Sequence, residues 1–397
     1  MFNQAMLRLG QNRSVIRDIF EYSKLRSAQI GADKVFDFSL GNPSVPPPPQ
    51  VGEAIARLLR EADPLLLHGY SSAQGDARVR QVLADSLQRR FGAQVGPDDL
   101  YLTSGAAAAL AISLKALCLP GDQVVLLAPF FPEYQVFVEA AGAEAVVVPA
   151  ERQALQIDFA ALESLLSPST RALIVNSPNN PSGVVLTRPV LERLCLLLLE
   201  KQEEYGHPIY LIADEPYREL VFDQEEPPYL PNLYDNAIVC YSYSKSLSLP
   251  GERIGYVAVP KTVAGHDELY AAVCGAGRAL GYVCAPTLFQ QVVAACVDVK
   301  PDIAAYRRNR DLLYGGLTEY GFRCVRPDGA FYLFMETPEP DAAAFCEKAK
   351  EFELLLVPSD SFGCPGFVRI AFCVSEQRIK DSLPAFKALA QSYGLCK

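Results

Sequence analysis

The stretch that decides the fold, residues 100–148, reads LYLTSGAAAALAISLKALCLPGDQVVLLAPFFPEYQVFVEAAGAEAVVV. It holds three short β-rich runs separated by stretches of helical character at 106–119 and near 133–141. Strands that are apolar on both faces and alternate with helices are typical of a mostly parallel sheet covered by helices. We therefore predict an α/β fold with a large sheet of the seven-stranded type. Its expected strands are residues 100–102, 124–127, 145–148, 172–175, 209–213, 238–241 and 255–259.

The pattern changes after about Pro286. A long helical stretch runs toward Tyr314, and short strands follow at 331–334 and 367–372, which indicates a smaller α+β domain. The proline cluster 46–49 suits neither a helix interior nor a central strand, so it marks the connection into the large domain. The predicted parts are an amino-terminal segment that belongs to the small domain (1–47), a large domain (48–290) and a small carboxyl-terminal domain (291–397).

Composition narrows the classes of function. The chain has 397 residues, of which 50% are hydrophobic and 21% charged, enough for a compact core around a buried ligand site. A net charge of -10 without a run of Lys or Arg argues against a nucleic-acid surface. The longest apolar run, 194–199, is far too short to cross a membrane. We expect small-molecule partners, with neither nucleic acid nor membrane.

The cysteines and the amino terminus bear on the compartment. Eleven Cys are scattered without paired C-x-x-C spacing, which favours reduced thiols over a disulfide framework or a metal site. Residues 1–10 lack the basic segment and apolar core of a secretory signal. The expected location is the cytoplasm.

Unusual side chains follow five of the expected strands. Ligands of parallel α/β sheets lie outside the carboxyl ends of the strands, so these positions are candidates for function. Each has an ordinary explanation as well: helix packing, a core aromatic, a tight turn, a hydrogen-bonded carboxylate or an exposed lysine. The segments are a small-residue turn (103–108), an aromatic turn (129–134), an Asn- and Pro-rich loop (176–183), an acidic segment (214–217) and a Ser-rich turn with one lysine (242–246).

Chemistry supports a functional interpretation of three of these segments. Free backbone N–H groups at a helix start near Gly105 suit a phosphate. Asp214 ends an apolar strand, and a buried carboxylate needs a charged or hydrogen-bonding partner. Lys245 lies among Ser and aromatic residues, where a partly desolvated amine is suited to forming a Schiff base.

Together the segments resemble the class I and II aminotransferases, which are fold-type I pyridoxal-phosphate enzymes. The resemblance covers nearly the whole chain. The motifs match the family in sequence, and they also follow one another in the family's order. Its motifs are Asn-Asn-Pro-Ser-Gly at 179–183, Asp-Glu-Pro-Tyr at 214–217, Ser-x-Ser-Lys at 242–245, Arg253 and Val-Arg-Ile-Ala-Phe at 368–372.

The resemblance implies that pyridoxal phosphate forms a Schiff base with Lys245, which then moves a proton at the substrate's α carbon. Asp214 is expected to pair with the pyridine nitrogen. Tyr217 and Asn180 are expected to hydrogen-bond to the phenolic oxygen of the ring, and Phe131 to stack on it. No metal is implied.

For the phosphate, the resemblance implies backbone amides of Gly105, Ala106 and Ala107, together with Ser242 and Arg253. The sequence departs here from the commoner family pattern, because Ala follows the glycine where many relatives have Ser or Thr. Cofactor binding is therefore expected to depend more on backbone groups, Ser242 and Arg253.

For the substrate, the resemblance implies that Arg369 binds the α-carboxylate, assisted by Asn180 and the backbone of Gly41. Arg278 is our candidate for a distal carboxylate, and the segment 15–17 is a candidate to close over the substrate. Tyr70 matches a family tyrosine that reaches the phosphate of the neighbouring subunit, which implies a homodimer with shared active sites.

The predicted activity is transfer of an amino group between an L-amino acid and a 2-oxo acid, with glutamate and 2-oxoglutarate as one pair and an aspartate-type donor as the other. Two alternatives remain: a lyase that carries out C–S β-elimination on the same scaffold, and a non-catalytic binding module. Residues 242–245 also fit the S-x-x-K pattern of serine acyltransferases, but neither S-D-N nor K-T-G accompanies it.

Overall fold

The computed structural model describes residues 2–11, 14–223 and 226–397. Its largest element is a seven-stranded sheet with the order β2-β8-β7-β6-β5-β3-β4. β3 to β7 pair in parallel, whereas β8 runs antiparallel between β2 and β7. The predicted α/β fold with a mostly parallel sheet is confirmed. The strands are β2 (Leu100–Thr103), β3 (Gln123–Leu127), β4 (Glu144–Val148), β5 (Thr170–Asn176), β6 (Tyr210–Asp214), β7 (Ala237–Ser242) and β8 (Gly255–Ala258).

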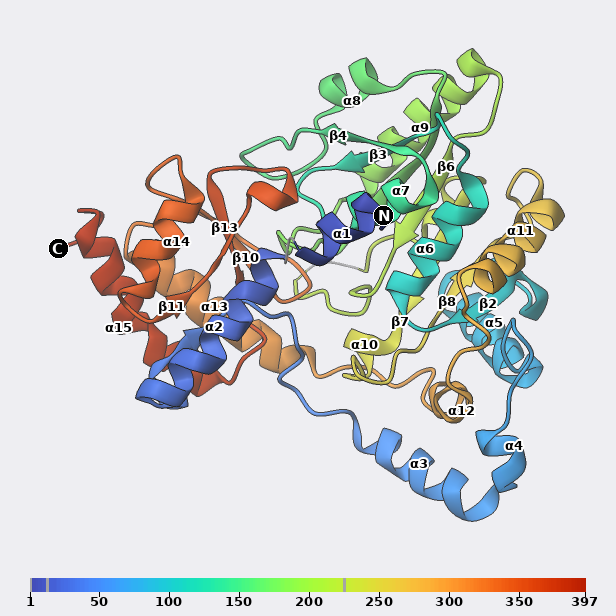
Figure 1. Cartoon of the computed structure of the whole chain (residues 1–397), viewed down its shortest axis with the longest axis horizontal. Coiled ribbons are helices and arrows are strands. Elements are labelled where there is room, and N and C mark those ends of the chain that lie inside the picture. Colours follow the sequence, from blue (N-terminus) through green and yellow to red (C-terminus); the bar gives the residue numbers. More distant parts are fainter. Residues whose placement is uncertain (1, 12–13, 224–225) are drawn as a thin grey trace.

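The sheet separates two hydrophobic cores because successive side chains of a strand point to opposite faces. In β5, Leu173 and Val175 belong to one core, while Ala172 and Ile174 belong to the other. Helices cover both faces, as Figure 1 shows. The first core includes residues of α3 (Pro49–Glu61), α5 (Ala77–Phe91), α8 (Phe159–Leu165), α9 (Arg188–Tyr205) and α12 (Thr287–Ala295). The second includes residues of α6 (Ala106–Leu117), α7 (Glu133–Ala141) and α11 (His266–Ala279).

A four-stranded antiparallel sheet of order β12-β13-β10-β9 forms late in the chain, in the orange and red part of Figure 1. β1 (Phe36–Asp37) pairs with β11 (Leu354–Leu355), so the early chain joins this part. The limits near 47 and 290 stay predictions. The other elements here are β9 (Cys324–Val325), β10 (Tyr332–Glu336), β12 (Val357–Pro358), β13 (Phe367–Ala371), α2 (Val15–Ile30), α13 (Ile303–Glu319), α14 (Ala342–Lys350) and α15 (Glu376–Ser392).

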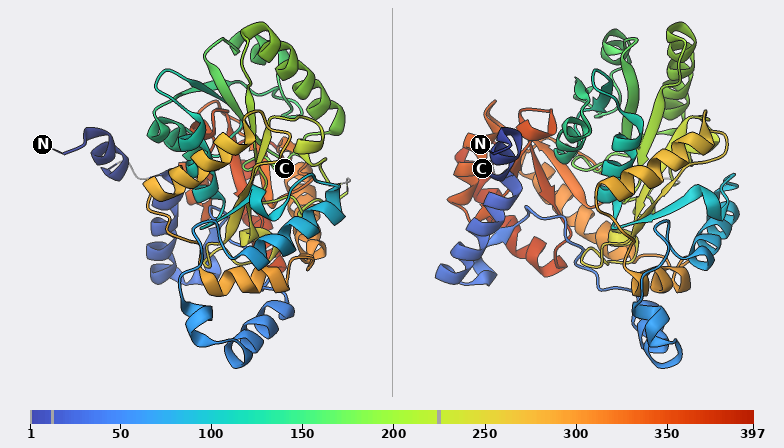
Figure 2. Two further views of the ribbon diagram at one scale, coloured as in Figure 1. Left: turned by 90° about the vertical axis from the view of Figure 1, so that its right-hand side faces the viewer. Right: turned by 45° about the vertical axis from the view of Figure 1, so that its right-hand side comes forward.

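The single long helical stretch predicted between Pro286 and Tyr314 is wrong, because α12 ends at Ala295 and α13 begins at Ile303. Pro301 stands in the interruption, and Asp302 caps α13 by accepting hydrogen bonds from the backbone amides of Ala304 and Ala305. Three further α-helices in the described ranges are short: α1 (Gln4–Gln11), α4 (Pro64–His68) and α10 (Tyr243–Ser246). Figure 2 shows α1 projecting from the body of the molecule and α3 and α4 projecting at its lower edge.

Within the described ranges, no helix is both long and apolar enough to cross a bilayer. Nor do three or more His, Cys, Asp or Glu side chains in these ranges come together in a group able to hold a metal ion. All eleven cysteines are free thiols.

Candidate active site

A cavity of about 300 Å³ lies beyond the carboxyl ends of β5, β6 and β7, between the two sheets. Asn176, Asp214 and Ser242 are the last residues of these strands and all three line it. Arg369 and Tyr332 enter from β13 and β10. Most of the residues singled out in the sequence meet here: Gly41, Ala106, Ala107, Phe131, Asn180, Asp214, Tyr217, Ser242, Lys245, Arg253 and Arg369.

Tyr70 and Arg278 do not reach this cavity within their own chain. The Tyr70 side chain is 89% exposed and follows α4, and Arg278 lies on the exposed side of α11. Ile16, from the amino-terminal segment predicted to close over the substrate, does line the cavity.

Lys245 projects from the short helix α10, which follows directly on β7. Its Nζ donates a hydrogen bond of 2.6 Å to the carbonyl of Gly41. Burial lowers the pKa of Lys245 to about 8, and the positive charges of Arg253 and Arg369 act in the same direction. The amine is therefore much closer to its neutral, nucleophilic form at physiological pH than an exposed lysine.

Asp214 is buried at the end of β6. Its Oδ2 accepts a hydrogen bond from the Tyr134 hydroxyl, whereas its Oδ1 has no hydrogen-bond partner among the residues that the structure describes. Burial raises the pKa of Asp214 to about 7, although the Tyr134 hydrogen bond opposes this. A buried acceptor without a donor is costly, so this oxygen suits a cationic N–H.

The start of α6 and the side chain of Arg253 form an anion cradle. Gly105 caps α6 with a φ of 86°, and a Cβ there would lie 2.7 Å from the Arg253 guanidinium. Only glycine therefore lets the arginine approach the amides of the first turn. Arg253 Nη1 also donates to Ser244 Oγ at 3.3 Å, and Ser244 Oγ lies 2.8 Å from Ser242 Oγ.

Asn180 and Tyr217 lie on opposite sides of Asp214 in the chain, and both line the cavity. Asn176 joins their segments, because its amide donates to the Asp214 carbonyl at 2.9 Å and accepts from the Asn180 backbone at 2.7 Å. The Tyr217 hydroxyl lies 2.9 Å from that of Tyr332.

Arg369 lies in β13, between β10 and β12, and is only 2% exposed. It is therefore not a surface charge on an edge strand. Its guanidinium donates to the Asn180 side chain at 3.2 Å and to the carbonyl of Ser39. The third nitrogen of the guanidinium, Nε, is buried without a partner in the described parts of the chain. A buried cation held in this way is ready to bind a carboxylate.

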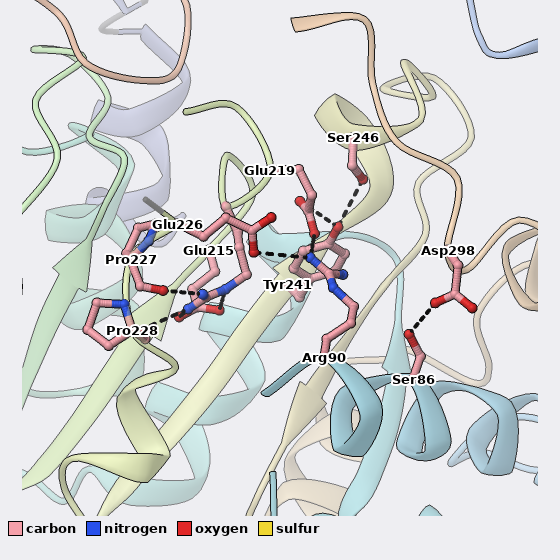
Figure 3. Close-up of polar contacts among 11 residues, drawn as sticks. Ser86, Arg90, Glu215, Glu219, Glu226, Pro227, Pro228, Tyr241, Ser246 and Asp298 are labelled. Carbon is pink, nitrogen blue, oxygen red and sulfur yellow. Dashed lines mark hydrogen bonds and ion pairs between the residues drawn. The ribbon is translucent and has the colours of Figure 1, made fainter. Parts of the chain in front are cut away.

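A second polar network, drawn in Figure 3, holds the segment after β6 and the turn after β7. Arg90 from α5 donates to Glu219 at 2.9 Å, and Glu219 accepts from the Tyr241 hydroxyl at 3.0 Å. The Tyr241 hydroxyl lies 2.9 Å from Ser246 Oγ, directly beside Lys245. The network therefore ties the segment after β6 to the turn that carries the lysine.

Reasoning from the sequence missed Tyr134, Tyr332, Ser244 and Asn176 as cavity residues. Tyr134 and Asn176 lie within segments that the sequence marks as unusual, but nothing in those segments indicates their partners. Tyr332 lies in a predicted strand and looks like an ordinary core aromatic. Their roles depend on contacts between segments that are distant in sequence.

Several known proteins are similar to this chain in sequence and in fold. The model of the family described as aminotransferase class I and II matches residues 33–386. An aspartate/prephenate aminotransferase of Thermus thermophilus is 33% identical over 87% of this chain and 88% of its own length. The solved structure of an amino transferase from Eubacterium rectale is 53% identical, covers 99% of both chains and has a TM-score of 0.97. Aspartate aminotransferase from Thermus thermophilus with maleate is 27% identical over 98% of this chain and 99% of its own, with a TM-score of 0.87.

Proposed function

The chain belongs to the class I and II aminotransferases, pyridoxal-phosphate-dependent enzymes that act on amino acids and 2-oxo acids, and on that premise we propose its substrates and the roles of its residues. One substrate pair is glutamate and 2-oxoglutarate, and the other donor is of the aspartate type. The observation that carries the residue roles is that Lys245, Asp214 and Arg369 line a single cavity. The aspartate-type donor is supported by similar proteins named aspartate/prephenate aminotransferase and aspartate aminotransferase.

The residues present fit the cofactor. The free Oδ1 of Asp214 suits a protonated pyridine nitrogen, and the cradle of Gly105 and Arg253 suits a phosphate. Bound pyridoxal phosphate supplies an electron sink for the bonds at the substrate's α carbon. The proposed contacts are the backbone amides of Gly105, Ala106 and Ala107, with Ser242 and Arg253, for the phosphate, Phe131 for the ring face, and Tyr217 and Asn180 for the phenolic oxygen.

The chain's own groups then divide the work. Lys245 Nζ, whose pKa burial lowers to about 8, holds the cofactor and moves the proton at the substrate's α carbon. Arg369 binds the α-carboxylate with the planar fork of its guanidinium, assisted by Asn180 and the backbone at Gly41. Ile16 covers the substrate and excludes water from the amine.

We also propose a homodimer with shared sites. Tyr70 is 89% exposed beside Leu65 and Leu66, which are 83% and 77% exposed, so α4 presents an apolar surface suited to a second copy. In this arrangement Tyr70 of one chain reaches the phosphate bound by the other chain. Arg278 likewise acts in the site of the other chain, where it binds the distal carboxylate of the substrate. Eleven free thiols support a reducing, cytoplasmic location.

The activity is tested by incubating the enzyme with single L-amino acids and 2-oxoglutarate. Formation of glutamate supports transamination, whereas pyruvate and ammonia without a 2-oxo acid acceptor indicate the β-eliminating lyase. Lys245→Ala should abolish both the turnover and the conversion of the cofactor by the amino donor; turnover that survives this change contradicts the assignment. Arg278→Ala should raise KM for aspartate much more than for an aromatic donor, and equal effects contradict its role.

A further inference from the structure

Tyr332 is a buried tyrosine of the cavity to which neither the family motifs nor the proposed reaction gives a role. It is the first residue of β10, and its hydroxyl lies 2.9 Å from that of Tyr217. The two rings meet edge to face with centroids 5.8 Å apart. The contact therefore joins the four-stranded sheet to the segment that follows Asp214.

Three contacts hold Tyr332 in place: the Tyr217 hydroxyl and Gly41 at its own hydroxyl, and Arg369 at its ring. A Cβ on Gly41 would lie 1.9 Å from the hydroxyl oxygen, so the hydroxyl occupies the space of a missing side chain. The Arg369 guanidinium carbon lies 4.9 Å from the centre of the Tyr332 ring. Tyr332 thus contacts Tyr217 and two residues with other roles in the site. Gly41 accepts a hydrogen bond from Lys245 through its carbonyl, and Arg369 is proposed to bind the α-carboxylate.

The direction of the hydrogen bond between the two tyrosines follows from the single hydrogen that each hydroxyl carries. Burial raises the pKa of Tyr332 to about 12, with the charge of Arg369 acting against the increase. Burial raises the pKa of Tyr217 well above its ordinary value. Both hydroxyls therefore keep their hydrogen at physiological pH. Because Tyr217 gives its one hydrogen to the bound cofactor in the role proposed above, it can only accept from Tyr332, whose hydroxyl lies 2.9 Å away. The hydrogen of Tyr217 is then free to point into the cavity.

We infer that Tyr332 is a positioning residue for the transamination site: its hydroxyl donates to Tyr217 Oη, which turns the hydrogen of Tyr217 toward the phenolic oxygen of the bound cofactor. The inference rests on the role proposed above for Tyr217. A donor that itself accepts a hydrogen bond is polarised and becomes a stronger donor. Loss of the Tyr332 hydroxyl should therefore weaken the contact between Tyr217 and the cofactor.

The test is a pH titration of the visible absorbance of the bound cofactor, without substrate, in Tyr332→Phe, Tyr217→Phe and the double variant. A phenolic oxygen that receives a weaker hydrogen bond is more basic. The proton that it shares with the Lys245 nitrogen is therefore lost at higher pH. Tyr217→Phe should raise the titration midpoint by about one to two pH units. Tyr332→Phe should raise it by about half a unit, and the double variant no more than Tyr217→Phe alone.

Tyr306→Phe is the matched control. It removes another buried hydroxyl, one with no partner in the described chain, and the Tyr306 ring packs against Phe331, as the Tyr332 ring also does. Its midpoint should equal that of the unmodified enzyme. If Tyr332→Phe fails to fold, incorporation of 3-fluorotyrosine at position 332 keeps the shape and makes the hydroxyl a stronger donor, so the midpoint should fall.

The outcomes separate this inference from the proposed function. A shift in Tyr217→Phe but none in Tyr332→Phe overturns the role of Tyr332 and leaves that of Tyr217 intact. Shifts that simply add in the double variant also overturn it, because Tyr332 would then act without Tyr217. No shift in Tyr217→Phe overturns both roles.

Discussion

Asp214→Asn should stabilise the cofactor-free protein at alkaline pH. The carboxyl group is buried, and its Oδ1 has no partner in the described residues. Burial raises its pKa from the ordinary 3.8 to about 7. Between these values the folded protein holds a proton that the unfolded chain has lost, so the free energy of unfolding falls as pH rises. The contribution of the protonated carboxyl is complete below about pH 4 and is lost by about pH 7, a total of roughly 4 kcal/mol.

Asparagine keeps the shape of the protonated acid and does not ionise. The variant should therefore exceed the unmodified apoprotein in stability by about 1–2 kcal/mol at pH 5 and by roughly 4 kcal/mol at pH 8. The effect on turnover should be opposite, because the amide cannot pair with a pyridinium. We expect activity of the cofactor-loaded variant to fall by about a thousandfold.

Urea unfolding of the apoproteins at pH 5, 6, 7 and 8, at one protein concentration, measures the difference. Asp85→Asn, on an exposed position of α5, makes the same change of charge at the surface and should show a small difference that varies little with pH. A constant difference across the pH range for Asp214→Asn, or a loss of stability at pH 8, would refute the reasoning, because the carboxylate would then be ionised and satisfied in the apoprotein.

Three further changes test other contacts. Arg369→Lys should lower kcat/KM by about a hundredfold for every donor in steady-state assays, since an ammonium cannot replace the bidentate fork; a loss confined to one donor would contradict a role at the α-carboxylate. Gly41→Ala places a Cβ 1.9 Å from the Tyr332 hydroxyl, so we expect a lower melting temperature and a kcat reduced about tenfold. Unchanged values would show that the segments carrying Gly41 and Tyr332 separate easily. Arg218→Leu leaves Glu215 buried without its ion pair, so the free energy of unfolding measured in urea should fall by about 3–5 kcal/mol. A decrease below about 1 kcal/mol would contradict this expectation.

Local sequence pattern predicted the central sheet well. Each of its seven strands lies within two residues of its expected limits, because strands buried on both faces must be continuous apolar runs. The antiparallel placement of β8 was not predicted: its sequence is as apolar as its neighbours', and direction depends on how the chain returns to the sheet. The break between α12 and α13 was also missed, although Pro301 marks it.

The sequence by itself determined which chemical groups follow the strands, since a carboxylate, a lysine and small residues stand out wherever an apolar run ends. Asp214 and Lys245 were found in this way. Only the tertiary structure decided which further groups meet at the cavity: Tyr134 with Asp214, and Tyr332 with Tyr217. The physical reason is that side-chain periodicity assigns a residue to a face of its own strand or helix, whereas these contacts depend on how separate elements pack against one another.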